Sequence, residues 1–272
     1  MINPNLNQLL SEFTSFRESG KLDSYGVYLY GVINKELYRQ SGKASANRSF
    51  RNSLMALIDS LLMFPYNWSA WRDLADLCLE NLSVHEEVEH RLEPISSHFM
   101  YHYFLIHNFM ELQDNEQALL LIEGLETLFS NSVYLQSQMA VAYYNMRDFD
   151  LAQDQFDMIR DHDPFRLDDM DVFSNILYVK EMKAELSSLA HSVVRTDKYR
   201  PECCCIVGNY YALKGQHEKA VQYFERALKL DPSFLSAWTL LGHEYIELKN
   251  TAAAVEAYRK AVDINPREYR AW

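Results

Sequence analysis

Hydrophobic residues recur at three- and four-residue intervals along most of the chain, which is the spacing of the buried face of an α-helix. Near the carboxyl end the pattern also repeats. The stretch CCCIVGNYYALKG starts at residue 203, and AWTLLGHEYIELK, with the same order of apolar and small positions, starts at residue 237. Positions that match at an offset of 34 residues are Val207, Gly208, Tyr211, Ala220, Phe224, Ala227 and Pro232 in the first copy and Leu241, Gly242, Tyr245, Ala254, Tyr258, Ala261 and Pro266 in the second. The chain is therefore predicted to be an array of helical pairs.

This period and these landmarks resemble the tetratricopeptide repeat, a pair of antiparallel helices called here helix A and helix B. A glycine such as Gly208 lets helix A approach helix B closely, and the proline begins the turn into the next repeat. Because one pair cannot bury its apolar face alone, successive pairs stack on one another. The predicted fold is an all-α tetratricopeptide-repeat α-solenoid, and the resemblance implies a right-handed superhelix with a concave inner face.

Weaker copies of the repeat precede these two, and they are expected at 68–98, 99–132, 133–166 and 167–200. In the first of them the segment HEEVEHRLEPISS is polar and holds Pro94, so its second helix is predicted to be brief or bent. In the unit before it, Gly31 and Ser53 stand 22 residues apart, about ten more than the matching interval after Gly208. The extra residues near 40–50 are predicted to form an inserted, mobile polar loop.

Three segments follow from this pattern. Residues 1–23 form an amphipathic segment, 24–166 hold the N-terminal repeats, and 167–272 hold further repeats. Trp272 occupies the fourth position of another repeat with no polar cap after it, so the chain is predicted to be a fragment of a longer array. The amphipathic segment covers the chain's own first repeat or docks into a partner, and the sequence leaves both open. Its apolar stripe consists of Leu6, Leu9, Leu10, Phe13 and Phe16.

Composition narrows the classes of function. With 38 acidic and 26 basic residues the chain carries a formal charge of −12, and an acidic surface repels phosphate, so a nucleic-acid partner is disfavoured. No run of apolar residues is long enough for a membrane span, and no signal peptide is visible. Four cysteines give no disulfide framework, so a reducing compartment fits.

Three consecutive cysteines, Cys203, Cys204 and Cys205, invite interpretation as a metal or redox site. In a helix their side chains point about 100° apart and cannot converge on one ion, so they are interpreted as packing residues. Cys204 is expected between helices and Cys205 in the groove, where serine should be tolerated. His98 and His102 stand four apart, but a packed helix is the preferred interpretation. No catalytic motif, metal site or cofactor is predicted.

In tetratricopeptide-repeat proteins the second, fifth, ninth and twelfth positions of helix A tend to line the groove, and the resemblance implies the same here. The groove residues so assigned are Tyr103, His107, Met110, Tyr144, Asp171, Asn175, Tyr178, Cys205, Asn209 and His243. Asparagine can hold a peptide backbone, and tyrosine or methionine can receive apolar side chains. The set lacks the basic cluster with which chaperone-binding repeats clamp a terminal carboxylate, which argues against a co-chaperone.

A more specific resemblance is carried by LDSYGVYLYGVI, MKAELSSLAHSVVRTDKYR, PECCCIVGNYYALKGQHEKAVQYFERALKLDP and HEYIELKNTAAAVEAYRKAV. These stretches resemble the eighth-subunit family of tetratricopeptide-repeat scaffolds of the anaphase-promoting complex. The resemblance implies a non-catalytic scaffold of a ubiquitin ligase, present in nucleus and cytoplasm. It also implies homodimerisation through the N-terminal repeats, and other subunits, small accessory subunits and activator as partners. Two alternatives remain: a peptide-binding adaptor, and the regulatory region of an enzyme whose catalytic domain lies beyond residue 272.

The first predicted helix is apolar nearly all round, although nothing stacks before it. Such a terminal helix needs a second burial surface, which a second copy of the chain would supply. The residues assigned to this dimer interface are Leu22, Tyr25, Val27, Tyr28, Leu29, Val32 and Ile33.

Overall fold

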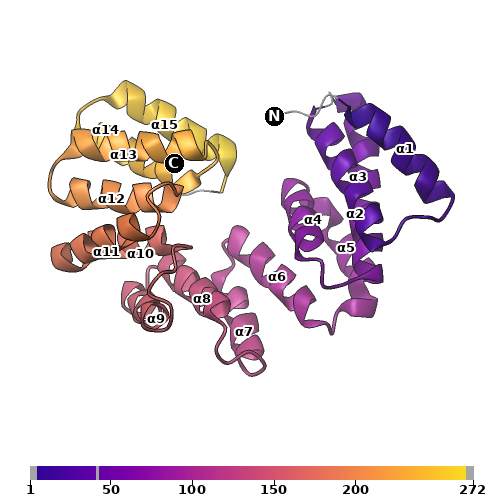
Figure 1. Cartoon of the computed structure of the whole chain (residues 1–272), viewed down its shortest axis with the longest axis horizontal. Coiled ribbons are helices and arrows are strands. Elements are labelled where there is room, and N and C mark those ends of the chain that lie inside the picture. The colour runs from indigo at the N-terminus through magenta and orange to yellow at the C-terminus, as the bar shows by residue number, and fades with distance from the viewer. Residues whose placement is uncertain (1–4, 41–42, 268–272) are drawn as a thin grey trace. The chain divides into compact units, whose positions relative to one another are not determined.

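The structure of the chain is a computed structural model that describes residues 5–40 and 43–267. These residues form α-helices, turns and two short 3-10 helices, and no strand occurs among them (Figure 1). The α-helices are α1 (Leu6–Glu18), α2 (Ser24–Gln40), α3 (Lys43–Met63), α4 (Trp68–Glu80), α5 (His85–Leu92), α6 (Phe99–Glu111), α7 (Asn115–Glu126), α8 (Val133–Asn145), α9 (Phe149–His162), α10 (Met170–Val179), α11 (Lys183–Thr196), α12 (Pro201–Leu213), α13 (His217–Leu230), α14 (Leu235–Glu247) and α15 (Thr251–Ile264). The predicted all-helical repeat fold is confirmed.

After α1 the described helices form seven A–B pairs, from α2 with α3 to α14 with α15. The chain divides into two compact units, unit 1 up to Leu121 and unit 2 from Ile122. Each unit has its own apolar core. Trp71 and Leu74 are fully buried in unit 1, and Phe156 and Phe173 are buried in unit 2.

Helix A meets helix B at the predicted glycine. A β-carbon placed on Gly208 would lie 2.4 Å from Cε1 of Phe224, and one placed on Gly242 would lie 2.5 Å from Cε1 of Tyr258. Carbon atoms do not approach so closely without a bond, so only glycine leaves room for the aromatic ring this close to helix A. In the first repeat Leu57 takes the place of the ring, and a β-carbon on Gly31 would lie 3.1 Å from its Cδ2. Nearby, the hydroxyl of Ser53 donates to the carbonyl of Gly31 at 2.8 Å.

The turn between helix A and helix B has the same backbone conformation in five successive repeats. One residue in each turn has a φ between 55° and 70°, and these residues are Gln113, Arg147, Glu181, Gly215 and Lys249. They are spaced 34 apart, although a single one of them is glycine. The backbone register of the repeat therefore persists where its side-chain landmarks are weak.

Of the residues inserted in the first repeat, 43–50 are helical and do not form the polar loop that was expected, and 41–42 lie outside the described residues. Instead α2 extends to Gln40 and α3 begins at Lys43, giving helices of 17 and 21 residues. The segment KASANRSF contains neither glycine nor proline, so nothing in it interrupts a helix. The brief second helix predicted near Pro94 is confirmed, because α5 has eight residues and gives way to a 3-10 turn at Glu93–Ile95.

The amphipathic segment covers the chain's own first repeat. Leu10 and Phe13 of α1 pack against Val27 and Tyr30 of α2. Arg17 fixes the end of α1, since its Nη2 lies 2.7 Å from Oδ2 of Asp59 and its guanidinium stacks over Tyr30. Of the two interpretations left open for α1, the structure supports the one in which α1 covers the chain's own first repeat. Phe16 is nevertheless exposed.

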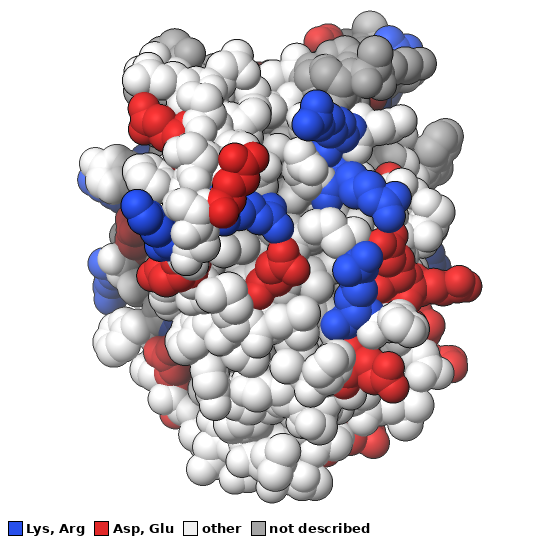
Figure 2. Space-filling view, turned by 90° about the vertical axis from the view of Figure 1, so that its right-hand side faces the viewer, with Lys and Arg blue, Asp and Glu red and all other residues white. Residues whose placement is uncertain are grey.

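A buried lysine joins the first two repeats of unit 1. Nζ of Lys35 lies 2.8 Å from Oδ1 of Asp73 and 2.7 Å from Oδ2 of Asp76, and its side chain is 4% exposed. Two carboxylates and the Asp73 carbonyl accept hydrogen bonds from the ammonium group, so the buried charge is paired, which offsets part of the cost of its desolvation. The face in Figure 2 shows basic and acidic side chains interleaved, with a broad uncharged area below them.

The glycine contact predicts a strong difference between two glycines. Gly208→Ala should destabilise the chain by about 1–3 kcal/mol, because its methyl group would overlap Phe224. Gly124→Ala is the matched control, because no atom lies within 4 Å of the place its methyl group would take and alanine favours a helix. Urea unfolding should give a lower midpoint for the first variant and an equal or higher one for the second. Equal midpoints would contradict the packing argument.

Candidate binding groove

Helices α8, α10, α12 and α14 of unit 2 place side chains around two neighbouring cavities. The larger has a volume of about 310 Å³ and is lined by Tyr144, Arg147, Phe149, Asn175, Tyr178, Val179, Ser236, Thr239, Leu240 and His243. The smaller, about 230 Å³, is lined by Tyr178, Asn209, Leu240, His243, Glu244, Ile246 and Glu247. Three residues line both, so the cavities form one surface, which we call the inner groove. Aromatic, amide and acidic side chains meet there.

Five residues assigned from sequence line the inner groove, and they are Tyr144, Asn175, Tyr178, Asn209 and His243. They come from four consecutive repeats. Position within helix A, together with the 34-residue period, is therefore enough to bring them together.

Two of these asparagines form a ladder between helices. Nδ2 of Asn209 donates to Oδ1 of Asn175 at 2.7 Å and to Oγ of Ser174 at 2.8 Å. Both asparagines are buried, so the bonds fix the orientation of each amide. The ladder positions the polar floor of the inner groove.

His243 is held by the helix B of its own repeat. Its Nδ1 lies 2.6 Å from the hydroxyl of Tyr258, whose ring packs on Gly242. The same aromatic position in the preceding repeat is Phe224, which has no hydroxyl. The landmark contact of the repeat thus also orients a groove side chain.

Asp171 is a buried carboxylate below the inner groove. It is 5% exposed, and no described Lys, Arg or His forms an ion pair with it. Burial, followed by repulsion from Asp169, raises the pKa of Asp171 to about 6, while a hydrogen bond from Ser236 works in the other direction. Ser236 lines the inner groove and donates a hydrogen bond to Asp171, so Asp171 lies directly behind a residue of the groove lining.

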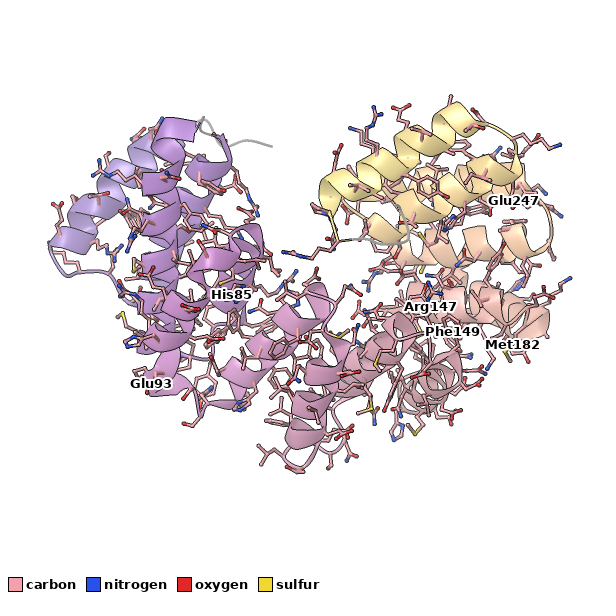
Figure 3. All side chains as sticks on the ribbon, turned by 180° about the vertical axis from the view of Figure 1, so that it is seen from behind. His85, Glu93, Arg147, Phe149, Met182 and Glu247 are labelled. Carbon is pink, nitrogen blue, oxygen red and sulfur yellow. The ribbon has the colours of Figure 1, made fainter. Side chains whose placement is uncertain are left out.

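A second acid, Glu244, lines the groove beside it. Its Oε2 lies 2.8 Å from Nδ1 of His217, and burial still raises the pKa of Glu244 above its usual value. Glu244 and Glu247 make the smaller cavity acidic, whereas Arg147 and Phe149 border the larger one at the turn between α8 and α9 (Figure 3).

Cys205 does not stand in the open groove as expected. It is fully buried, and burial, followed by the charge of Asp171, raises the pKa of its thiol well above the usual value. Cys204 is buried between helices as predicted, and Cys203 is buried as well. Cys205, at the fifth position of α12, lies where α12 comes close to α10, and its small side chain fits between the two helices. Substitution by serine there is therefore no longer expected to be cheap.

The remaining groove residues assigned from sequence lie in unit 1. The rings of Tyr103 and His107 each stand 6.5 Å from Trp68, and Met110 is almost buried. Burial lowers the pKa of His107. On the same helix, His98 caps the first turn through the amide of Met100, which gives it a structural role.

The residues assigned to a dimer interface divide into two groups. Val27 and Ile33 are buried inside unit 1, and the hydroxyl of Tyr28 donates to Oδ2 of Asp73 at 2.9 Å. Leu22 and Val32 are partly buried. Tyr25 and Leu29 are 52% and 47% exposed and lie four residues apart on α2. The helix is less exposed than its sequence indicated because α1 covers one side of it.

Several groove residues were missed from sequence, among them Arg147, Phe149, Ser236 and Glu247. Arg147 occupies the left-handed turn position and Phe149 begins α9, so neither belongs to the helix A positions that tend to line the groove. Ser236 does occupy the second position of α14, but no residue was assigned from that position. The turn position that recurs every 34 residues, and is a glycine at Gly215, was the signal that could have indicated Arg147.

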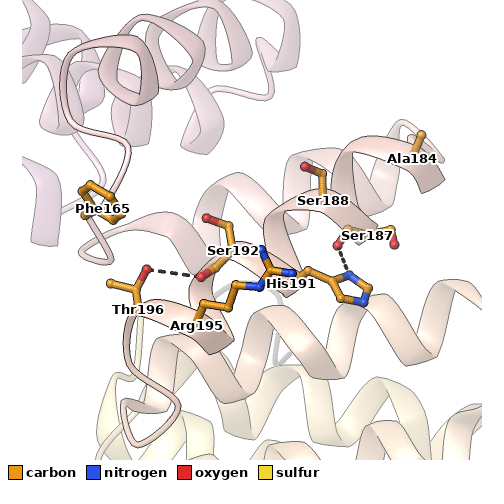
Figure 4. A pocket seen from close by; sticks show the side chains of 8 residues that line it. All are labelled: Phe165, Ala184, Ser187, Ser188, His191, Ser192, Arg195 and Thr196. Carbon is orange, nitrogen blue, oxygen red and sulfur yellow. Dashed lines mark hydrogen bonds between the residues drawn. The ribbon is translucent and has the colours of Figure 1, made fainter.

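A further hollow, about 660 Å³ in volume, lies along α11 (Figure 4). Serine, histidine and arginine meet there, but Nδ1 of His191 donates to the carbonyl of Ser187 at 2.6 Å within the same helix. No lining carboxylate orients the imidazole for catalysis. Among the described residues, no group of three or more His, Cys, Asp or Glu could hold a metal ion. None of the described helices is long and apolar enough to cross a membrane.

Comparison with known proteins decides the family. A family model described as anaphase promoting complex subunit 8 / Cdc23 matches residues 1–140. The anaphase-promoting complex subunit 8 of Arabidopsis thaliana is 49% identical over 252 residues, which is 93% of this chain and 41% of the relative. The chain belongs to the anaphase-promoting complex subunit 8/Cdc23 family. Subunit 8 of Dictyostelium discoideum is 44% identical over 86% of this chain and 37% of its own length.

The chain spans about two fifths of the length of these subunit 8 relatives. Two tetratricopeptide-repeat models match residues 201–234 and 235–268, which is the register predicted from sequence. A solved Cut9–Hcn1 hetero-tetramer of the anaphase-promoting complex contains a similar chain, with a TM-score of 0.64 and 18% identity over 88% of this chain and 45% of that one. At this identity the likeness supports the fold.

The raised pKa of Asp171 predicts a pH-dependent stability. Between pH 4 and 6 the folded chain binds a proton that the unfolded chain releases, so this group makes stability fall as pH rises through that window. Above pH 6 the ionised side chain costs on the order of 3 kcal/mol. Asp171→Asn should therefore raise the unfolding midpoint at pH 7.5 and give little gain at pH 4. The control Asp150→Asn, at an exposed site, should change stability little at either pH. A gain at position 171 that is independent of pH would refute the assignment.

Proposed function

We propose that the chain is a non-catalytic scaffold region of subunit 8 in an anaphase-promoting complex, a ubiquitin ligase of nucleus and cytoplasm. Unit 1 pairs with a second copy of the chain. The inner groove of unit 2 receives segments of other subunits, with small accessory subunits and activator among the partners. Membership of the subunit 8 family supports the complex, and the groove geometry supports the peptide-binding role.

The observation that carries the groove proposal is the combination of aromatic and acidic side chains above a fixed amide floor. Tyr144 and Tyr178 offer flat apolar surface, and the Asn175–Asn209 ladder holds polar groups ready for a peptide backbone. Asp171 and Glu244 both keep raised pKa values because their charge is poorly solvated. A basic side chain of a bound segment would stabilise the ionised carboxylate of Glu244, which lines the smaller cavity directly beside Glu247. The segment received is therefore an apolar and basic one.

The pairing proposal rests on the exposed part of α2. Tyr25 contacts Phe64 at a ring-centroid distance of 5.7 Å, and Phe64 contacts Tyr66, which is also exposed. Together with Leu29 these residues make an apolar surface at the start of unit 1. Covering such a surface is the usual contribution of a second copy in a symmetric dimer.

Light scattering on this chain tests the pairing. The wild-type chain should have the mass of a dimer at tens of micromolar, a concentration on the order of those used for specific interfaces. Tyr25→Glu combined with Leu29→Glu should give a folded monomer, because both side chains are exposed and neither belongs to the buried core. Leu82→Glu, at another exposed leucine, is the control and should remain dimeric. A monomeric wild-type chain would refute pairing and leave the groove proposal standing.

A further inference from the structure

A separate slot lies outside the inner groove, between α13 and α15. It has a volume of about 360 Å³ and is lined by Glu225, Leu228, Lys229, Trp238, Leu241, Tyr245, Ala253, Glu256 and Ala257. We call it the Tyr245 slot. Its floor is apolar, and its charged rim holds two glutamates and one lysine.

The preceding repeat shows what such a slot holds. Thirty-four residues before Tyr245 and Ala257 stand Tyr211 and Tyr223. Their rings stack with centroids 5.4 Å apart and planes 20° apart, and Nζ of Lys219 lies 5.4 Å above the ring of Tyr211. That repeat therefore covers its own tyrosine with an aromatic ring and a cation.

The last described repeat lacks both covering groups. Ala257 stands where Tyr223 stands one repeat earlier, and Ala253 stands where Lys219 does. Trp238, which replaces the small Cys204, forms a wall of the slot, and the cavity remains beside it. Tyr245 is held in place because its hydroxyl donates to Oε1 of Glu225 at 3.1 Å. The slot is thus a preformed site whose missing parts are a ring and a cation.

We infer that the Tyr245 slot binds a partner segment in which a phenylalanine or tyrosine is followed by a lysine or arginine. The ring enters between Trp238 and Tyr245 and stacks on Tyr245 as Tyr223 does on Tyr211. The following cation lies at Glu256, which is exposed on the rim beside Glu225. The charge of the rim and the acidity of the whole chain favour a basic partner over an acidic one.

The test uses the 272-residue chain with 5-fluorotryptophan and follows the fluorine resonance of Trp238, assigned with Trp238→Phe. The probe is the dipeptide N-acetyl-phenylalanyl-arginine amide, which should shift this resonance with an affinity in the millimolar range expected for so small a ligand. The alanyl-arginine dipeptide lacks the ring and should give no saturable shift. The phenylalanyl-glutamate dipeptide should bind several-fold more weakly. Equal shifts with all three dipeptides would overturn the inference.

Two variants locate the site. Ala257→Tyr should fill the slot from within, abolish the shift and leave the melting temperature equal or higher, as the Tyr211–Tyr223 pair of the preceding repeat implies. Glu256→Lys should weaken arginine-probe binding roughly threefold without changing the fold, as expected for one exposed ion pair. Binding that survives Ala257→Tyr in a folded chain would refute the slot. If that variant unfolds, an unchanged affinity in Glu256→Lys would refute the assigned charge preference.

Discussion

The close contact between a glycine of helix A and an aromatic ring of helix B fixes the geometry of the carboxyl-terminal repeats. Gly208 with Phe224 and Gly242 with Tyr258 leave no room for a β-carbon. The ring sets how near the two helices lie, and that separation sets which faces remain for the next pair. Helical pairs that share one separation between helix A and helix B can stack on one another, and stacking buries the apolar faces that a single pair leaves exposed.

The inner groove is a consequence of this stacking. Helices α8, α10, α12 and α14 follow one another with the same spacing, so residues at one position of helix A stand side by side. Asn175 and Asn209 can therefore bond directly, although they are 34 residues apart. Tyr258 shows the same constraint at a finer scale, because its ring closes the repeat while its hydroxyl holds His243. One side chain therefore both packs the repeat and orients a residue of the inner groove.

Sequence periodicity predicted the helices, the register and half of the assigned groove residues, since each depends on spacing along the chain. It could not predict what depends on neighbours in space. Cys205 is buried because α10 and α12 come close there, and Val27 is buried because α1 folds back over α2. Residues 43–50 were wrongly expected to belong to a loop, because this polar segment shows no helical period although its residues tolerate a helix.

The inner groove and the Tyr245 slot of unit 2 differ in their chemistry: the groove lies over a buried charge, whereas the slot depends on side-chain volume. Below the inner groove, burial opposes the charge of Asp171 and raises its pKa, so the ionised side chain costs stability. Around the Tyr245 slot, side-chain volume differs between successive repeats: the small Cys204 and the large Tyr223 of one repeat correspond to the large Trp238 and the small Ala257 of the next. This difference preserves packing within each repeat, because the glycine–aromatic contact is untouched, but it changes which ring is covered. Tyr211 is stacked by its own chain, whereas Tyr245 borders a cavity. A solenoid can therefore acquire different surfaces at successive repeats without altering the spacing that holds it together.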